Sequence, residues 1–282
     1  MRLLGTLWLA ETIKLGTRTS ARATLVALTG VGLFGPLWLW FLTHAGVEVN
    51  GGDLGAAIDV CAANGMRWSM IVRGFYVSQA LWLLLASQSV AGELQAHTLR
   101  EELLRPVPRH LVLLAKWAAL SGWCLLSMIA ALAAGSVAAV VLLPGDGVAT
   151  WAQVVQGAFG AWIAEIGFLA FAVAISVVTR SVAGGVVATL LFLMVDRLTA
   201  TGLWLLGTFL EGMPADLAPT VPGWLMIVMR ASPVLPSNAW SAWRELLDGA
   251  TPLTWQAWVA LAVWTALSAV VAERVFARTD VP

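Results

Sequence analysis

Three ionisable side chains, Glu165, Asp196 and Arg197, interrupt long apolar runs of this 282-residue sequence. Ionisable residues inside such runs are costly to bury and rarely face hydrocarbon, so each needs a partner. A tight turn is expected near Arg180, and Glu165 and Arg197 lie at similar distances before and after it. We therefore predict that Glu165 pairs with Arg197 across an antiparallel hairpin. Asp196, about 100° away on its helix, should face another segment or the outer interface.

Such a pair has two possible roles: it fixes the packing of two helices, or it lines a polar path for a substrate. Other catalytic or metal-binding patterns are missing from the sequence. His44, His97 and His110 are scattered and lack metal-ligand spacing. Neither Lys14 nor Lys116 follows the glycine-rich loop that holds nucleotide phosphates. We expect no metal and no cofactor in this chain, so that any ATP and Mg²⁺ bind to a partner.

A second candidate is the charged segment 93–110, "ELQAHTLREELLRPVPRH", in a chain with 16 acidic and 16 basic side chains. Thr98 and Glu101 have the spacing of a capping box, which starts a helix. Pro106 would end it, so we predict a short helix over about 99–105. This pattern suits a rigid contact element, and a solvated loop is the alternative.

The composition indicates a membrane protein, because 60% of the residues are hydrophobic, 11% are charged and the mean hydropathy is +0.84. A soluble domain has about 25% charged residues. The net charge of zero gives no sign of nucleic-acid binding. A helical span needs about 20 apolar residues. The sequence thus predicts an all-α membrane protein, one transmembrane domain over 1–282, with spans at 23–43, 68–92, 111–143, 151–179, 182–210 and 255–274.

Orientation follows from lysine and arginine, which favour the cytoplasmic side. With the N-terminus inside, 11 of the 16 basic residues fall on that side. We therefore expect both termini, the tail 275–282 and the loop 93–110 to be cytoplasmic. The remaining five are Arg67, Arg73, Arg197, Arg230 and Arg244. Charges from Glu11 onward interrupt the place where a signal peptide has its apolar core, so no cleavable signal is expected.

The first 22 residues are predicted to form an interfacial helix. Leu3, Leu4, Leu7 and Trp8 share one face at helical spacing. Glu11 and Lys14 then fall on or near that face and degrade the pattern. An ordinary charged extension is the alternative.

The outer segment 211–254 is rich in Pro and Trp, and its apolar pieces 224–230 and 237–247 are too short to span a membrane. We predict short ordered helices at the interface or re-entering the membrane, with Ser237 as the cap of the second piece. Trp240, Trp243 and Leu247 would lie on one side of it. A loosely packed loop is the alternative.

The stretch "AGELQAHTLREELLRPVPRHLVLLAKW" resembles the first cytoplasmic loop of type-2 ABC transporter permeases. Members often carry a Glu, then Gly-Thr-Leu, then Pro-x-x-Arg and a following Lys. The matching positions here are Glu93, Thr98, Leu99, Pro106, Arg109 and Lys116. His97 departs from the pattern, because it stands where glycine is common.

The resemblance implies that this loop is a coupling helix, which docks on a separate ABC ATP-binding subunit. The residues expected to serve that contact are Glu93, Thr98, Leu99, Arg100, Glu101, Leu103, Pro106 and Arg109. It further implies the permease subunit of a bacterial exporter in the inner membrane, surrounded by lipid. A second copy or a paralogue would complete it. In a mechanotransmitting role, 211–254 would engage a periplasmic partner instead of cargo. The alternatives are a membrane-embedded enzyme and a membrane scaffold without transport.

Overall fold

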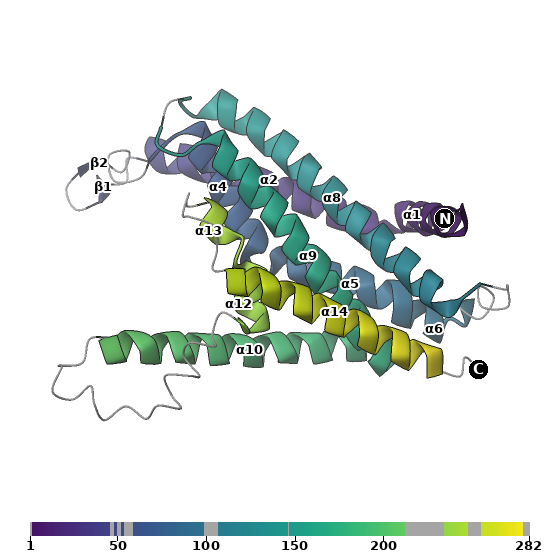
Figure 1. Ribbon diagram of the computed structural model, residues 1–282. Coiled ribbons are helices and arrows are strands. Elements are labelled where there is room, and N and C mark those ends of the chain that lie inside the picture. The colour runs from purple at the N-terminus through teal and green to yellow at the C-terminus, as the bar shows by residue number, and fades with distance from the viewer. Residues whose placement is uncertain are drawn as a thin grey trace.

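The described part of the chain is almost entirely helical in a computed structural model (Figure 1), which confirms the all-α prediction. The exception is a pair of two-residue antiparallel strands, β1 (Glu48–Val49) and β2 (Gly52–Asp53). The structure describes residues 2–45, 48–49, 52–53, 59–98, 107–145, 147–211, 234–247 and 255–278.

Five helices are long and apolar enough to cross a membrane. They are α2 (Thr19–His44), α8 (Arg109–Leu142), α9 (Trp151–Thr179), α10 (Val182–Glu211) and α14 (Trp255–Arg278). Each corresponds to a span expected from the sequence, and α8 ends one residue before its predicted end at 143. α9 begins behind a capping box, in which Thr150 Oγ1 accepts from the Gln153 N–H and the Gln153 side chain accepts from the Thr150 N–H.

The expected span 68–92 lies inside a helical stretch that runs from residue 62 to residue 95 but is not one regular helix. Its pieces are α4 (Ala62–Val72), η1 (Arg73–Val77), α5 (Ser78–Ser87), η2 (Gln88–Gly92) and α6 (Glu93–Gln95). η1 and η2 are π-helical turns, each of which fits an extra residue into the helix. The six-span layout therefore remains a prediction.

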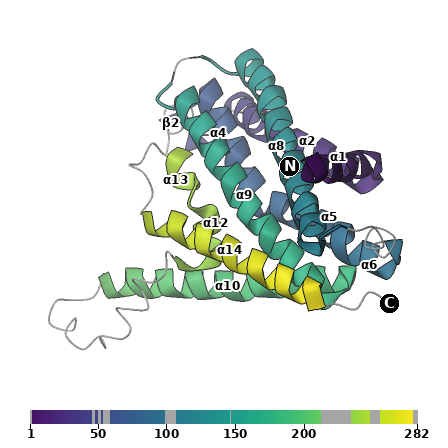
Figure 2. The same cartoon turned by 45° about the vertical axis from the view of Figure 1, so that its right-hand side comes forward.

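α9 is the central helix of the bundle. In its most apolar window 72% of the residues are buried, against 22% in α10. Figure 2 shows α9 passing between α4 and α8 on one side and α14 on the other. α8 also packs along α2, where a Cβ on Gly32 would overlap the carbonyl of Ala131.

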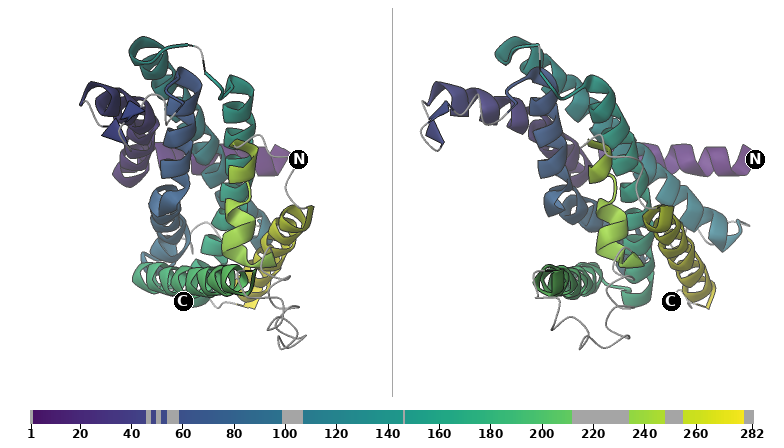
Figure 3. Two further views of the ribbon diagram at one scale, coloured as in Figure 1. Left: turned by 90° about the vertical axis from the view of Figure 1, so that its left-hand side faces the viewer. Right: turned by 60° about the vertical axis from the view of Figure 1, so that its left-hand side comes forward.

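The two ends of the molecule differ in what they carry. Both termini, α6 and the α9–α10 turn lie at one end, and β1, β2 and the α8–α9 turn lie at the other (Figure 1). α1 (Arg2–Thr17) extends sideways from the bundle (Figure 3). It ends at Arg18, whose extended backbone (ψ 129°) separates it from α2.

Two short helices, α12 (Pro236–Ser241) and α13 (Arg244–Leu247), agree with the prediction of ordered outer pieces. Trp240, Trp243 and Leu247, predicted to lie on one side of a single piece, are all buried, although Trp243 lies between the two helices. The prediction that Ser237 is the N-cap is wrong. Leu235 is the N-cap residue of α12, and its side chain makes no capping hydrogen bond. The piece 224–230 lies outside the described residues.

Candidate functional site

Five charged residues meet at the end of the bundle that carries the termini. We call them the inner charge cluster: Glu11 and Lys14 of α1, Arg18, Glu93 of α6 and Lys116 of α8. Lys116 is 2% exposed, and its Nζ donates to Glu93 Oε2 and, at 2.9 Å, to Glu11 Oε1. Lys116 therefore joins α1, α6 and α8 at one buried point.

Glu93 is the second centre of this cluster. Its Oε1 accepts from Arg18 Nη2 and from Lys14 Nζ, the latter at 3.2 Å. Burial alone would raise the pKa of the Glu93 carboxyl, but Lys116, Lys14 and Arg18 together lower it below its ordinary value. Glu93 is therefore held as a carboxylate, and the cluster carries three positive and two negative charges.

The spacing of the α1 charges explains how they reach the cluster. Glu11 and Lys14 are three residues apart and so lie on one side of α1, and Arg18 follows directly after the helix ends at Thr17. That side packs toward α8 and also holds Leu15, which is 2% exposed. From the sequence, Glu11 and Lys14 were expected to interrupt an apolar face of α1. In the structure they lie on the face that packs against α8.

The apolar residues predicted to share one face of α1 differ in how far they are buried against the bundle. Leu4 and Leu7 are partly buried, but Leu3 is 45% exposed and Trp8 is 41% exposed. The reason is that the charged residues direct the buried side of α1. The signal available in the sequence was the three-to-four spacing that continues from Leu4 and Leu7 through Glu11 and Lys14.

The two ends of the predicted coupling loop are tied to the bundle. At its start, Glu93 bonds to α1 and α8 through the inner charge cluster, and Thr98 Oγ1 donates to the Glu93 carbonyl at 3.4 Å. At its end, Arg109 Nη1 donates to the carbonyls of Phe276 (3.5 Å) and Ala277 (3.2 Å), in the last turn of α14. Cationic side chains stabilise helix C-termini in this way.

The predicted helix over about 99–105 lies outside the described residues, as do Glu101 of its capping box and its ending proline. The expected contact residues affected are Leu99, Arg100, Glu101, Leu103 and Pro106. His97, just before them, has a left-handed backbone with φ 57°. Glycine adopts that conformation without strain, which accounts for the glycine common at this position in the resembling loops.

A separate ion pair lies midway along the helices. Arg73 Nη2 of η1 donates to Glu165 Oε2 of α9 at 3.1 Å, and the two residues are 1% and 7% exposed. Arg73 Nη2 also donates to Ser127 Oγ of α8 at 2.9 Å, and the Cys124 thiol donates to Glu165 Oε2. This membrane-core pair thus holds α8, α9 and η1 together.

The predicted partner of Glu165 is corrected by this finding: it is Arg73 and not Arg197. α9 and α10 open apart from their turn instead of running side by side, so equal sequence distance from Arg180 does not give equal position (Figure 1). Arg73 was predicted to lie on the outer side, but its side chain is buried between the helices of the bundle. The available signal was its position inside the apolar run 68–92.

Asp196 is buried and faces α12, where its Oδ2 accepts from the Ser237 backbone N–H at 2.6 Å. Arg197 lines a shallow groove on α10 with Leu190, Leu193 and Met194. The three ionisable residues that an embedded enzyme would have used therefore do not converge. Within the part of the chain that the structure describes, no three acidic, His or Cys side chains gather in a group suited to a metal ion.

Residues 69–281 match the family model described as "ABC-2 family transporter protein", which covers well over half of the chain. No curated protein matches the sequence. This match agrees with the presence of apolar helices long enough to span a membrane. It also agrees with the bonds at both ends of the loop between α6 and α8. The chain belongs to the ABC-2 family of transporter proteins, the type-2 ABC permeases that its 93–116 segment resembles.

Proposed function

We propose that this permease subunit transmits ATP-driven movement from a separate ATP-binding subunit, through the loop between α6 and α8, to the membrane helices. The observation that carries the proposal is that both ends of the loop are bonded to other helices. Glu93 at its start is bonded to α1 and α8, and Arg109 at its end is bonded to α14. A push on the loop would therefore reach three helices.

The burial of these bonds supports the proposed transmission. Glu93 is 4% exposed and Lys116 is 2% exposed, so water does not compete for their charges. Breaking a buried ion pair by removing one partner costs about 3 kcal/mol or more, because a charge is left without compensation. A displacement of the loop would thus move its attached helices before it broke these bonds.

We further propose an exporter in a bacterial inner membrane with both termini in the cytoplasm. The proposal is supported by the common end of the molecule that carries the termini, α6 and the α9–α10 turn (Figure 1). A second permease copy or a paralogue would complete the transporter. α10 supports this, because Leu191, Met194, Val195 and Leu198 expose more than half of their surface and need lipid or protein to cover them.

The test is co-expression of the tagged chain with candidate ABC ATPases, followed by purification and ATP turnover in lipid vesicles. We expect one ATPase to co-purify and its turnover to respond to the permease. Arg109→Glu should lower that response at least several-fold, because it removes the bond to α14. Arg180→Asn is the matched control, because it removes a charge at the same end while keeping a residue that tolerates φ 52°.

Two results would contradict the proposal. One is that no ATPase co-purifies, which favours the scaffold alternative. The other is that Arg109→Glu leaves ATPase binding and turnover unchanged, which would remove the loop from the coupling route. Transport of fluorescent lipophilic compounds in inverted vesicles tests the direction separately, since export predicts accumulation inside them.

A further inference from the structure

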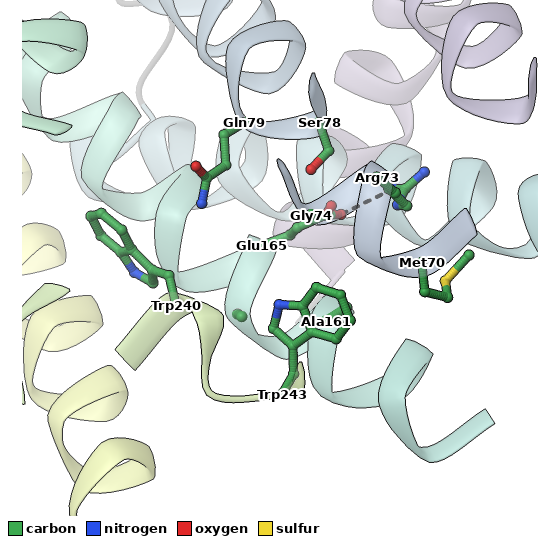
Figure 4. A pocket seen from close by; sticks show the side chains of 10 residues that line it. Met70, Arg73, Gly74, Ser78, Gln79, Ala161, Glu165, Trp240 and Trp243 are labelled. Atoms are coloured by element: carbon green, nitrogen blue, oxygen red, sulfur yellow. Dashed lines mark hydrogen bonds and ion pairs between the residues drawn. The ribbon is translucent and has the colours of Figure 1, made fainter. Parts of the chain in front are cut away.

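A small cavity lies beside the membrane-core pair, where η1, α5, α9 and α12 meet. The volume open to the centre of a water molecule is about 10 Å³. Figure 4 shows Gln79 and Ser78 above this space, Trp243 below it, and Trp240 and Arg73 on opposite sides. A volume of this size suits a single water molecule and excludes an organic ligand.

The walls of this cavity carry polar atoms without protein partners. They are Arg73 Nε and Nη1, Gln79 Oε1 and Trp240 Nε1. The three side chains are 1%, 9% and 2% exposed. Buried donors and acceptors are almost always hydrogen-bonded, to protein or to ordered water. Donors from Arg73 and Trp240 and an acceptor from Gln79 form the kind of polar lining that a buried water needs.

The charge of the site indicates which ligand belongs there. Glu165 already neutralises Arg73 at 3.1 Å, so the cavity offers no net charge to hold an anion. The guanidinium beside it would repel a cation. A neutral ligand that both donates and accepts hydrogen bonds can satisfy the unpaired donors and the unpaired acceptor of the cavity wall. Water is the smallest such ligand.

We propose that this cavity binds one ordered water molecule, which accepts from Arg73 and from Trp240 Nε1 and donates to Gln79 Oε1. The water extends the membrane-core network to α12. The network then runs from Ser127 of α8 through Arg73 and Glu165 to the water, and from the water to Gln79 of α5 and Trp240 of α12. α12 is thereby linked to the centre of the bundle by a polar contact as well as by packing.

Hydroxyl-radical footprinting in ¹⁸O-labelled water tests the proposal on the intact membrane protein. Radicals formed from a bound water oxidise its neighbours even when these are buried. Met70 lines the cavity and is 1% exposed, while Met66 and Met128 are 0% and 2% exposed and do not line it. We expect Met70 to gain ¹⁸O sulfoxide several-fold faster than Met66 and Met128.

Two variants separate a bound water from transient opening of the protein. Ala161→Val adds two methyl groups to the cavity wall and should reduce Met70 labelling to the level of Met66. Gln79→Leu removes the acceptor and should have the same effect, and it serves if Ala161→Val does not fold. Equal labelling of the three methionines in the parent protein would overturn the proposal. So would fast Met70 labelling that neither variant reduces.

Discussion

Lys116 bridges two carboxylates, and it is the most buried cation of the inner charge cluster. Lys116→Met should lower the free energy of unfolding by about 3 kcal/mol, because Glu11 and Glu93 lose their shared buried partner. Lys14→Met is the matched control. The Lys14 side chain is 33% exposed, so its loss should cost no more than about 1 kcal/mol. Thermal unfolding in detergent measures both changes.

A double variant tests the physical reason for the Lys116 effect. If the cost comes from an uncompensated carboxylate, Glu93→Gln added to Lys116→Met should recover part of the lost stability. Strictly additive losses in the double variant would show that the two side chains act independently and would contradict the cluster as described.

Substitutions at His97 test the left-handed backbone conformation at the start of the predicted coupling helix. Its φ of 57° is unfavourable for a β-branched residue, so His97→Val should lower the free energy of unfolding by about 1 kcal/mol. His97→Gly should not lower it, because glycine adopts this conformation freely. Ala96→Gly, at φ −81°, is the control and should be destabilising. A loss of stability in His97→Gly larger than in His97→Val would contradict the strain.

At the residue scale, the sequence was sufficient to single out several of the important charged residues. It was not sufficient to predict which of them form ion pairs with each other. Glu93 and Lys116 were marked by resemblance, and Glu165 by its apolar surroundings. Their partners Glu11 and Arg73 were not found, because pairing depends on how helices cross. Glu11 lies 105 residues before Lys116, and Arg73 lies 92 residues before Glu165, so local spacing in the sequence carries no information on these pairs.

α12 depends on a carboxylate from another helix. Asp196→Ala should leave the buried Ser237 N–H without an acceptor, at a cost of about 2 kcal/mol. We expect faster amide hydrogen exchange over 236–247. Asp196→Asn keeps an acceptor oxygen and should have a smaller effect. Thr199→Ala, one turn further along α10 at an exposed site, is the control, and exchange as fast in that variant would argue against the role of Asp196.

At the element scale, length and hydropathy were sufficient for α2, α8, α9, α10 and α14, because membrane thickness fixes how long an apolar helix must be. The same rule could not find η1 and η2, since a π turn leaves the apolar run unbroken. It also could not show that α9 and α10 open apart, because a tight turn at Arg180 allows many crossing angles.

For the whole molecule, two carboxylates at opposite ends should set the acid limit of stability. Hydrogen bonds from the Ala149 and Val148 backbone lower the pKa of Asp59, although burial opposes them. The pKa of Glu93 is lowered by its cations. A lowered folded-state pKa stabilises the protein above the ordinary value and loses this contribution as pH falls, so the melting temperature should drop below about pH 4.

Variants at the two sites assign this acid sensitivity. Glu93→Gln should melt lower than the parent at neutral pH but lose less on acidification, because the titrating group is gone. Asp59→Asn should behave in the same way through the contact between residues 59 and 149. If both variants lose as much melting temperature as the parent when the pH falls from neutral to about 3, other carboxylates control the transition.

The two π turns between Ala62 and Gln95 make the count of residues in this stretch a constraint of its own. Arg73 is the first residue of η1, and Glu93 directly follows η2. Inserting or removing one residue while both π turns are kept would rotate everything beyond the change by about 100°. Glu93 would then turn away from Lys116 although no contacting side chain had changed. Over evolutionary time this stretch should accept substitutions more readily than insertions or deletions, so that its length is inherited as strictly as its charges.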